Sequence, residues 1–276
     1  MSDDVGTWAV LTAAGSGTRL GAPVPKALVP VGDITLLELA VSRLVGAQGM
    51  RGIVVTCPPG MEEQFLAAAT AGGVSPDLVR VVAGGVSRQS SVKAGLDALK
   101  TWMEEGVPSR GPLAASDVDE QIVLIHDAAR CLAPVGLMNK LVEALRPTTS
   151  GGGSGSSSDE AASPSFPAGV IPGLPVTDTI KQVRETGAGD VVVATPPRSA
   201  LRAVQTPQAF RMGPLFAAHE KHLHLGADEE SAATDDAALL ELAGDPVVVI
   251  EGDPLAFKVT IPPDLEATRK HLAEGA

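Results

Sequence analysis

Short apolar runs rich in β-branched residues alternate with helical patterns along the first half of the chain, and this alternation limits the fold more than any other feature. Such runs, bounded by turn residues, predict buried strands, and apolar residues at helical spacing predict helices that cover them. Alternating strands and helices form βαβ units, so we expect an α/β fold with a mostly parallel sheet and helices on both faces. The expected strands are 8–12, 53–56, 79–83 and 122–126, and the expected helices are 36–45, 61–71, 90–103 and 137–145.

The second half of the chain departs from this alternation. Residues 147–168 are rich in Gly and Ser and hold too little apolar surface to offset the entropy of ordering, so we expect a flexible insertion. Residues 169–204 are strand-like and contain turn signals, which predicts a protruding arm or hairpin rather than another βαβ unit. We expect 1–276 to form one domain that includes this insertion and arm. Its remaining elements are expected to be helices at 213–225, at 234–243 and from Asp264, and strands at 247–251 and 257–261.

The charge balance and the cysteine count exclude several classes of protein. The formal net charge is −12, and nucleic-acid binding requires a basic face, so no nucleic-acid partner is expected. The first residues, MSDDVG, are acidic and do not resemble a signal peptide, and no apolar run is long enough to span a bilayer. Two cysteines cannot form a disulfide framework. A cytoplasmic location without membrane contact is therefore expected.

A glycine-rich segment, Ala13-Ala14-Gly15-Ser16-Gly17-Thr18-Arg19, follows the first expected strand directly. Small residues let backbone N–H groups approach an anion, and Arg19 and Lys26 add cationic donors nearby. A dinucleotide fingerprint would need glycine at Leu20, and a P-loop would need a Gly-Lys pair that does not follow here. A tight strand-to-helix turn explains the glycines alone equally well, but the two cations favour a phosphate-binding loop.

A second polar segment, His126-Asp127-Ala128-Ala129-Arg130, begins at the carboxyl end of an expected central strand, the edge where open α/β sheets bind ligands. Asp127 can bind a metal or a hydroxyl group, and Arg130 can bind a phosphate; a salt-bridged strand end is the alternative. Three more segments place a hydroxyl or a cation beside an expected strand. Each is a weak signal alone: 175–181 with Thr179, 205–210 with Thr206, and 257–260 with Lys258.

Two segments have simpler interpretations than catalysis. His219 and His222 flank Glu220 but are three residues apart, whereas the zincin motif separates its histidines by four, so a solvated helix end is expected. Asp235 and Asp236 follow Thr234 at an expected helix start, which predicts an N-cap with acidic residues in the first turn.

Taken together, the chain closely resembles the 2-C-methyl-D-erythritol 4-phosphate cytidylyltransferases of the non-mevalonate isoprenoid pathway. The resemblance extends over nearly the whole chain in a fixed order of segments: AAGSGTRLGAPVPKAL, AGGVSRQSSVKAGL, VLIHDAAR, PVTDTIK, RSALRAVQTPQAF, ATDDAALLE and FKVTIPPDL. It implies a Rossmann-like nucleotidyltransferase fold with a protruding β-arm. It also implies transfer of CMP from CTP to a polyol phosphate, releasing pyrophosphate. The magnesium ion would be held mainly by CTP phosphates, with Asp127 as the one possible side-chain ligand.

The resemblance also implies roles for individual residues and an assembly. It makes 169–204 a dimerisation arm, so we expect a homodimer. One departure is Cys131, which stands where the family usually has proline after HDAAR and is expected at the mouth of the site. The implied catalytic residues are Arg19, Lys26 and Lys258; the implied CTP-binding residues are Ala13, Ala14, Gly15, Gly17, Gly85 and Ser91; and the implied substrate-binding residues are Asp127, Arg130, Thr179, Arg198 and Thr206.

Three alternatives remain open at this point. Ribitol 5-phosphate cytidylyltransferases share much of the same motif order, and their substrate is also a short polyol phosphate. Another nucleotidyltransferase, with a different base or a sugar 1-phosphate, is a second alternative. A nucleotide-binding dimer without catalysis is the third, although every cation that the chemistry needs is present.

Overall fold

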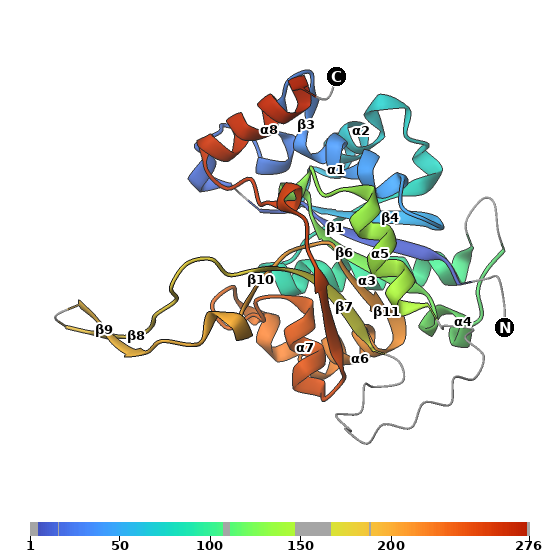
Figure 1. Ribbon diagram of the computed structural model, residues 1–276. Helices are drawn as coiled ribbons and strands as arrows, with labels where there is room; N and C mark the ends of the chain where they lie inside the picture. The colour runs from blue at the N-terminus through green and yellow to red at the C-terminus, as the bar shows by residue number, and fades with distance from the viewer. Residues whose placement is uncertain (1–4, 16, 107–110, 147–166, 188, 275–276) are drawn as a thin grey trace.

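The computed structural model describes residues 5–15, 17–106, 111–146, 167–187 and 189–274. An eight-stranded sheet runs through it in the order β10-β7-β11-β6-β1-β4-β5, with β12 also paired to β7 (Figure 1). The pairs β1–β4, β1–β6, β4–β5 and β7–β12 are parallel, while β11 and β10 run antiparallel to their neighbours, so the mostly parallel sheet is confirmed. The strands are β1 (Thr7–Thr12), β4 (Met50–Cys57), β5 (Val79–Ala83), β6 (Ile122–Asp127), β7 (Gly169–Pro175), β10 (Arg202–Val204), β11 (Gln208–Arg211) and β12 (Val247–Glu251).

Helices cover both faces of this sheet, as the sequence predicts. Successive residues of β1 alternate between two buried clusters: Ala9 and Leu11 face one, and Trp8 and Val10 face the other. The first cluster packs under α1 (Leu36–Val45), α2 (Glu62–Thr70), α5 (Val135–Leu145) and α8 (Pro262–Glu274). The second packs under α3 (Arg88–Glu105), α4 (Ala115–Asp119), α6 (Met212–Lys221) and α7 (Asp236–Ala243).

Side-chain caps fix the first residues of two helices, α3 and α7. Ser87 and Ser90 form a capping box at the start of α3, in which each side chain accepts the other residue's backbone N–H. Asp235 caps α7 by accepting the N–H of Ala238, which confirms the predicted cap and assigns it to Asp235. The caps determine where Arg88 and Asp236, the first residues of α3 and α7, stand relative to the sheet.

The segment 169–204 is divided between the sheet and a protrusion. Its first strand, β7, is largely buried and belongs to the central sheet, and β10 at its end belongs to that sheet as well. The expectation that the whole segment lies outside the sheet is therefore wrong for 169–175 and for 202–204. The apolar residues of β7, such as Val170 and Ile171, are buried. Strand patterning alone does not distinguish such a buried strand from a strand of an exposed hairpin. Beyond β7 the chain leaves the body and forms the β8–β9 hairpin, β8 (Gln182–Thr186) and β9 (Gly189–Ala194), drawn as a projection in Figure 1.

Other sequence expectations need smaller corrections. Residues 257–261 do not form the expected strand; the segment is anchored where the N–H of Val259 donates to the carbonyl of Ala129 at 2.8 Å. Most of the expected insertion, 147–166, lies outside the described residues, while Ala168 at its end is buried beside β7. Elements that the sequence analysis did not predict include the strand β11, the short helix α4 and the small hairpin of β2 (Pro30–Val31) and β3 (Ile34–Thr35).

Both cysteines are free and buried in the first cluster. Burial raises the pKa of the Cys57 thiol to about 11 and that of Cys131 to about 12. Cys131, expected at the mouth of the site, is therefore a core residue behind it. Separately, none of the helices in the described ranges has the length and apolarity that a bilayer crossing requires.

Candidate active site

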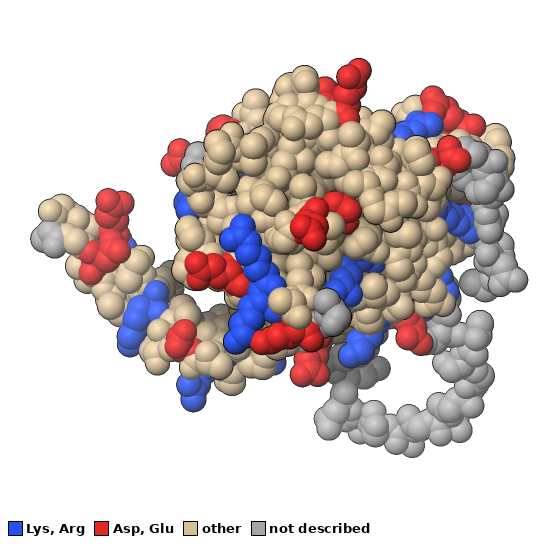
Figure 2. Space-filling model, turned by 90° about the horizontal axis from the view of Figure 1, so that it is seen from above, with Lys and Arg blue, Asp and Glu red and all other residues tan. Residues whose placement is uncertain are grey.

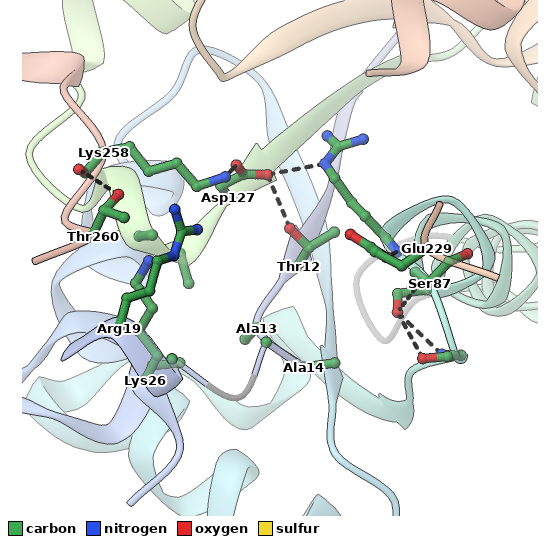
Figure 3. Close-up of a pocket in the computed structure, with 18 of the residues that line it drawn as sticks. Thr12, Ala13, Ala14, Arg19, Lys26, Ser87, Asp127, Glu229, Lys258 and Thr260 are labelled. Carbon is green, nitrogen blue, oxygen red and sulfur yellow. Dashed lines mark hydrogen bonds and ion pairs between the residues drawn. The ribbon is translucent and has the colours of Figure 1, made fainter. Parts of the chain in front are cut away.

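A cavity of about 550 Å³ opens at the carboxyl ends of β1 and β6, beside the start of α3. The parallel register places Thr12 directly opposite Asp127, so the two strands end together at its floor. The loop after β1 and the loop before α3 form its walls (Figure 3). The predicted residues that line it are Ala13, Ala14, Gly15, Gly17, Arg19, Lys26, Gly85, Ser91, Asp127 and Lys258.

The two walls can approach each other only because glycines stand at the contact points. A Cβ on Gly84 would lie 2.8 Å from the Cβ of Ala14 and 2.9 Å from the hydroxyl of Ser91. Gly17 has a φ of +65°, and a Cβ there would lie 2.5 Å from the Cβ of Lys26. Gly17 therefore lets η2 (Lys26–Leu28) pack against the loop and brings Lys26 to the cavity.

Three cationic side chains gather at one end of the cavity. Figure 3 shows Arg19, Lys26 and Lys258 on the same side of the pocket, with Glu229 and Ser87 on the opposite side. Burial, together with the nearby charges of Lys258 and Arg19, lowers the pKa of Lys26 to about 8. Cations this close together repel one another, so the cluster favours a polyanion at this end.

Asp127 is the central anion of the site. Its Oδ1 accepts from the hydroxyl of Thr12 at 3.1 Å and from Nε of Arg88 at 3.3 Å, and its Oδ2 accepts from Nζ of Lys258 at 2.8 Å. Burial opposes ionisation of the carboxyl, but Arg88 and Lys258 outweigh it and hold the pKa of Asp127 well below its usual range. Asp127 is therefore a carboxylate at all physiological pH values.

Thr206 and His126 are buried residues that fix the backbone of Asp127 on the side away from the cavity. The Thr206 hydroxyl accepts the backbone N–H of Asp127 at 3.0 Å and lies 3.0 Å from Nδ1 of His126. Burial lowers the pKa of His126 to about 4, so its ring is neutral at pH 7. In the described structure Thr206 contacts the strand end and does not line the cavity.

The remaining predicted substrate residues lie away from the cavity of their own chain. Arg130 donates to the backbone carbonyls of Ala256, at 2.6 Å, and Val204, at 3.4 Å, and so ties η8 (Pro254–Ala256) to β10. Thr179 and Arg198 are exposed on the two segments that connect the β8–β9 hairpin to the body, where Arg198 donates to the carbonyl of Thr177 at 3.0 Å. Within one chain, the structure therefore does not bring these three side chains to the cluster at Lys26.

Sequence reasoning missed several residues of the site region, among them Thr12, Arg88, Asp236 and Glu229. Arg88 lines the cavity and bridges Asp127 and Asp236, and Glu229 accepts the backbone N–H of Arg88 at 2.8 Å at the cavity edge. Arg88 lies within AGGVSRQSSVKAGL and Asp236 within ATDDAALLE, two segments that carry the family resemblance. That resemblance is the one signal that marks them, because their partners are far away in sequence.

The donor set suits a metal ion that arrives with its own ligands. No group of three or more His, Cys, Asp or Glu side chains that could hold a metal occurs within the described ranges. The expected solvated helix end is wrong for His219, which is 1% exposed and pairs with Asp236. Both oxygens of Asp127 are engaged by cations or by Thr12. A magnesium ion that a ligand brings on its phosphate oxygens would suit this donor set, with Asp127 as the side chain that could contact it.

A parallel sheet, a small-residue loop after its first strand and a cationic cluster at the carboxyl edge together define an α/β protein that binds a nucleotide phosphate, as nucleotidyltransferases do. Residues 7–107 and 159–274 match the family model described as 2-C-methyl-D-erythritol 4-phosphate cytidylyltransferase. The chain belongs to this family.

Individual relatives agree with the family match. The chain is 40% identical over 263 residues to the 2-C-methyl-D-erythritol 4-phosphate cytidylyltransferase of Corynebacterium glutamicum, covering 93% of this chain and 89% of that protein. A Rhodococcus jostii protein of the same name is 40% identical over 268 residues, covering 97% and 96%. The crystal structure of the enzyme of that name from Thermus thermophilus superposes with a TM-score of 0.63 at 29% identity, covering 96% of this chain and 98% of that one.

Proposed function

We propose that the protein transfers a cytidylyl group from CTP to 2-C-methyl-D-erythritol 4-phosphate, giving 4-diphosphocytidyl-2-C-methyl-D-erythritol and pyrophosphate. The observation that supports this most directly is the convergence of Arg19, Lys26 and Lys258 on one end of a cavity whose wall is the small-residue loop after β1. Homologues at about 40% identity along most of the chain are named for the methylerythritol acceptor, which favours it over ribitol 5-phosphate.

The proposed chemistry is in-line attack of the acceptor phosphate on the α-phosphorus of CTP. A bond forms between an acceptor phosphate oxygen and this phosphorus, while the bond to the bridging oxygen breaks and pyrophosphate leaves with its electron pair. A phosphate monoester is ionised at neutral pH, so the protein has to position the reactants and stabilise charge rather than abstract a proton. Arg19 and Lys26 would stabilise the leaving pyrophosphate, and Lys258 would contact the α-phosphate.

The nucleoside would lie at the other end of the cavity. The backbone at Ala13, Ala14 and Gly85, and the hydroxyl of Ser91, are the proposed cytosine contacts. The hydroxyl of Ser91 accepts the N–H of Gly85 at 3.1 Å and donates to the carbonyl of Ser87 at 2.9 Å, which fixes the shape of this wall. Gly15 and Gly17 would bring backbone N–H groups to the triphosphate.

Magnesium, dimerisation and location are parts of the same proposal. Magnesium would neutralise charge on the triphosphate and would be held mainly by phosphate oxygens, beside Asp127. The arm, with Thr179 and Arg198, would reach the polyol phosphate in the site of a second subunit, whose own Asp127, Arg130 and Thr206 would complete that subsite. A cytoplasmic location is supported by two buried, free thiols.

The test is pyrophosphate release measured with Mg²⁺, each of CTP, UTP, ATP and GTP, and a panel of polyol phosphates that includes ribitol 5-phosphate. We expect turnover with CTP and the methylerythritol phosphate to exceed every other pair at least roughly tenfold, because the base contacts are fixed backbone groups. Comparable turnover with UTP would refute the base assignment, and faster turnover with ribitol 5-phosphate would refute the acceptor. Binding of CTP without turnover of any acceptor would leave only the non-catalytic alternative.

A further inference from the structure

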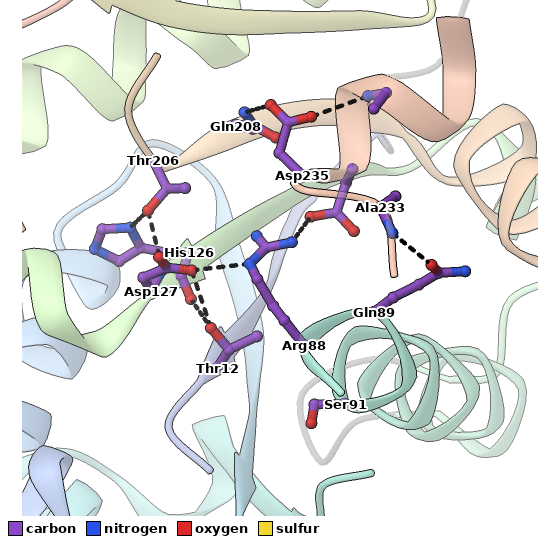
Figure 4. A network of polar contacts seen from close by, with 12 residues as sticks. Thr12, Arg88, Gln89, Ser91, His126, Asp127, Thr206, Gln208, Ala233 and Asp235 are labelled. Carbon is purple, nitrogen blue, oxygen red and sulfur yellow. Dashed lines mark hydrogen bonds and ion pairs between the residues drawn. The ribbon is translucent and has the colours of Figure 1, made fainter. Parts of the chain in front are cut away.

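A chain of polar contacts leads from the helices beside the sheet into the floor of the cavity. His219, on α6, donates from Nε2 to Oδ1 of Asp236 at 3.0 Å, and Nη1 of Arg88 donates to Oδ2 of Asp236 at 2.8 Å. Arg88 then reaches Asp127 through Nε at 3.3 Å, and Lys258 contacts the other oxygen of Asp127 at 2.8 Å. Figure 4 shows the Arg88 side chain extending from α3 to Asp127 at the end of β6.

The two cations that contact Asp127 differ in how firmly their side chains are held. The side chain of Arg88 is 18% exposed and contacts a carboxylate on each side, whereas the side chain of Lys258 is 42% exposed and forms its ion pair with Asp127. Asp236 and His219 are each 1% exposed. Arg88 is therefore fixed from behind by buried groups, and Lys258 can leave Asp127 with little change in the packing.

The charge count explains why a fixed arginine matters. Arg88 and Lys258 balance Asp127 and Asp236, so the four groups together are neutral. If Lys258 turns to an anionic ligand, Arg88 is the contact ion pair that Asp127 retains. A guanidinium presents several donors in one plane and can bridge two carboxylates, which a lysine ammonium does less well.

We propose that Asp236 is a positioning residue of the reaction: it holds Arg88 as the permanent counter-ion of Asp127, so that Lys258 is free to turn to the substrate. Asp236 does not line the cavity and acts only through Arg88. The expected effect on catalysis rests on the proposed function, whereas the arrangement of charges is independent of it.

The first test is a double-mutant cycle on turnover with CTP and the methylerythritol phosphate. Asp236→Asn should lower kcat roughly tenfold and change the KM for CTP less than about threefold, because the triphosphate contacts are elsewhere. In an Asp127→Asn background the same substitution should cost less than about twofold, since Arg88 then has no carboxylate to hold in the cavity. Equal losses in both backgrounds would mean a purely structural role and would overturn the proposal.

Two further variants keep this test decisive. Asp235→Asn is the matched control: Asp235 caps the same helix and contacts Gln208 but not Arg88, and asparagine also caps well, so kcat should stay within about twofold. If Asp236→Asn does not fold, Arg88→Lys keeps the positive charge but loses the bridge. It should give the same loss in kcat and the same insensitivity in the Asp127→Asn background; losses that multiply would overturn the proposal.

The second test does not depend on any activity. It follows the carboxyl carbon of Asp127 by NMR during a pH titration of the wild type and of Asp236→Asn. Removing a nearby negative charge would by itself lower the pKa of Asp127, whereas loss of Arg88 from its position would raise it. The substitution does not alter the other charged or titratable side chains near Asp127, which are Lys258, Lys26, Arg130 and His126. A midpoint of Asp127 that rises into the pH range where Asp236→Asn is folded supports the proposal, and a carboxylate that stays ionised throughout that range overturns it, even if the wild type proves inactive with CTP.

Discussion

The body of the protein and its projecting arm differ in how their strands are stabilised. In the body, β1 and β6 are buried between helices on both faces, and their ends hold the cavity. In the arm, β8 and β9 pair only with each other, and Val183, Val191 and Val192 are 46%, 47% and 55% exposed. On the face seen in Figure 2, acidic and basic side chains are interspersed along the arm rather than gathered by sign.

In the proposed dimer, this difference separates residues whose contacts are complete within one chain from residues that would act in the partner's site. An isolated two-stranded hairpin is only marginally stable in water. The exposed valines on both of its strands can stabilise it only if another surface buries them. Lys26 and Asp127 already share a cavity with their partners, whereas Thr179 and Arg198 lie on the arm, away from that cavity. The body is thus expected to tolerate isolation, and the arm is expected to require a second copy.

Removing a cationic side chain from the cavity in the body should cause the largest loss of kcat. Lys26→Ala and Arg19→Ala should each lower kcat roughly 100-fold or more, because each removes a donor from the charge that develops on the leaving group. The control is Lys270→Ala, on α8, whose side chain is 78% exposed and pairs within the helix. Steady-state kinetics and Tm would be measured together. Near-normal kcat in both cavity variants, with folding intact, would make the loop purely structural.

Arg198→Ala tests whether the arm serves another chain. Loss of one charge-assisted contact of about 2 kcal/mol predicts a roughly 30-fold fall in turnover. Mixing it with Lys26→Ala should restore activity: after random exchange about half the dimers are mixed, each with one intact site, so roughly a quarter of all sites recover.

The control for this mixing experiment pairs Arg198→Ala with Thr179→Ala. Both lesions then lie on arms, every site of a mixed dimer receives one of them, and no recovery is expected. If Lys26→Ala and Arg198→Ala also fail to complement after verified subunit exchange, Arg198 serves its own chain or has no role, and the contrast between body and arm disappears.

The pH dependence of kcat/KM for CTP should report Lys26. Its pKa of about 8 means that the ammonium is lost as pH rises through that value, so binding of the triphosphate weakens on the alkaline side. We expect kcat/KM to fall roughly tenfold between about pH 7 and pH 9. Lys26→Arg remains charged over this range and should remove the fall. An alkaline decline of the same size in Lys26→Arg would assign the titration to another group.

The smallest effect is expected from deleting residues 150–163. This part of the sequence is polar and rich in Gly and Ser, so it can contribute little buried surface to either the body or the arm. Turnover should stay within about twofold and Tm within about 2 °C, no more than the shift that roughly 1 kcal/mol causes in a domain of this size. A large drop in Tm, measured by calorimetry, would show that the segment packs against the body.

The body was more predictable from sequence than the arm and the ionic contacts. The strands at Trp8 and Ile122 are long apolar runs bounded by turns, so their type and order follow from periodicity. The boundary at β7 could not be found, because strand propensity does not say which residues become buried. The bridge at Arg88 could not be found either, because it joins residues 39 and 148 positions away along the chain. Only the order of motifs pointed to those segments.

The two buried thiols make the molecule well suited to site-specific labelling. Both Cys57 and Cys131 stay protonated near neutral pH and are shielded from solvent, so maleimide reagents should leave them unmodified. A single cysteine introduced at Val192, at the exposed face of β9, would then be the one reactive position on the native protein. A spin label or fluorophore attached there would measure the separation between arms directly, without any change to the wild-type cysteines.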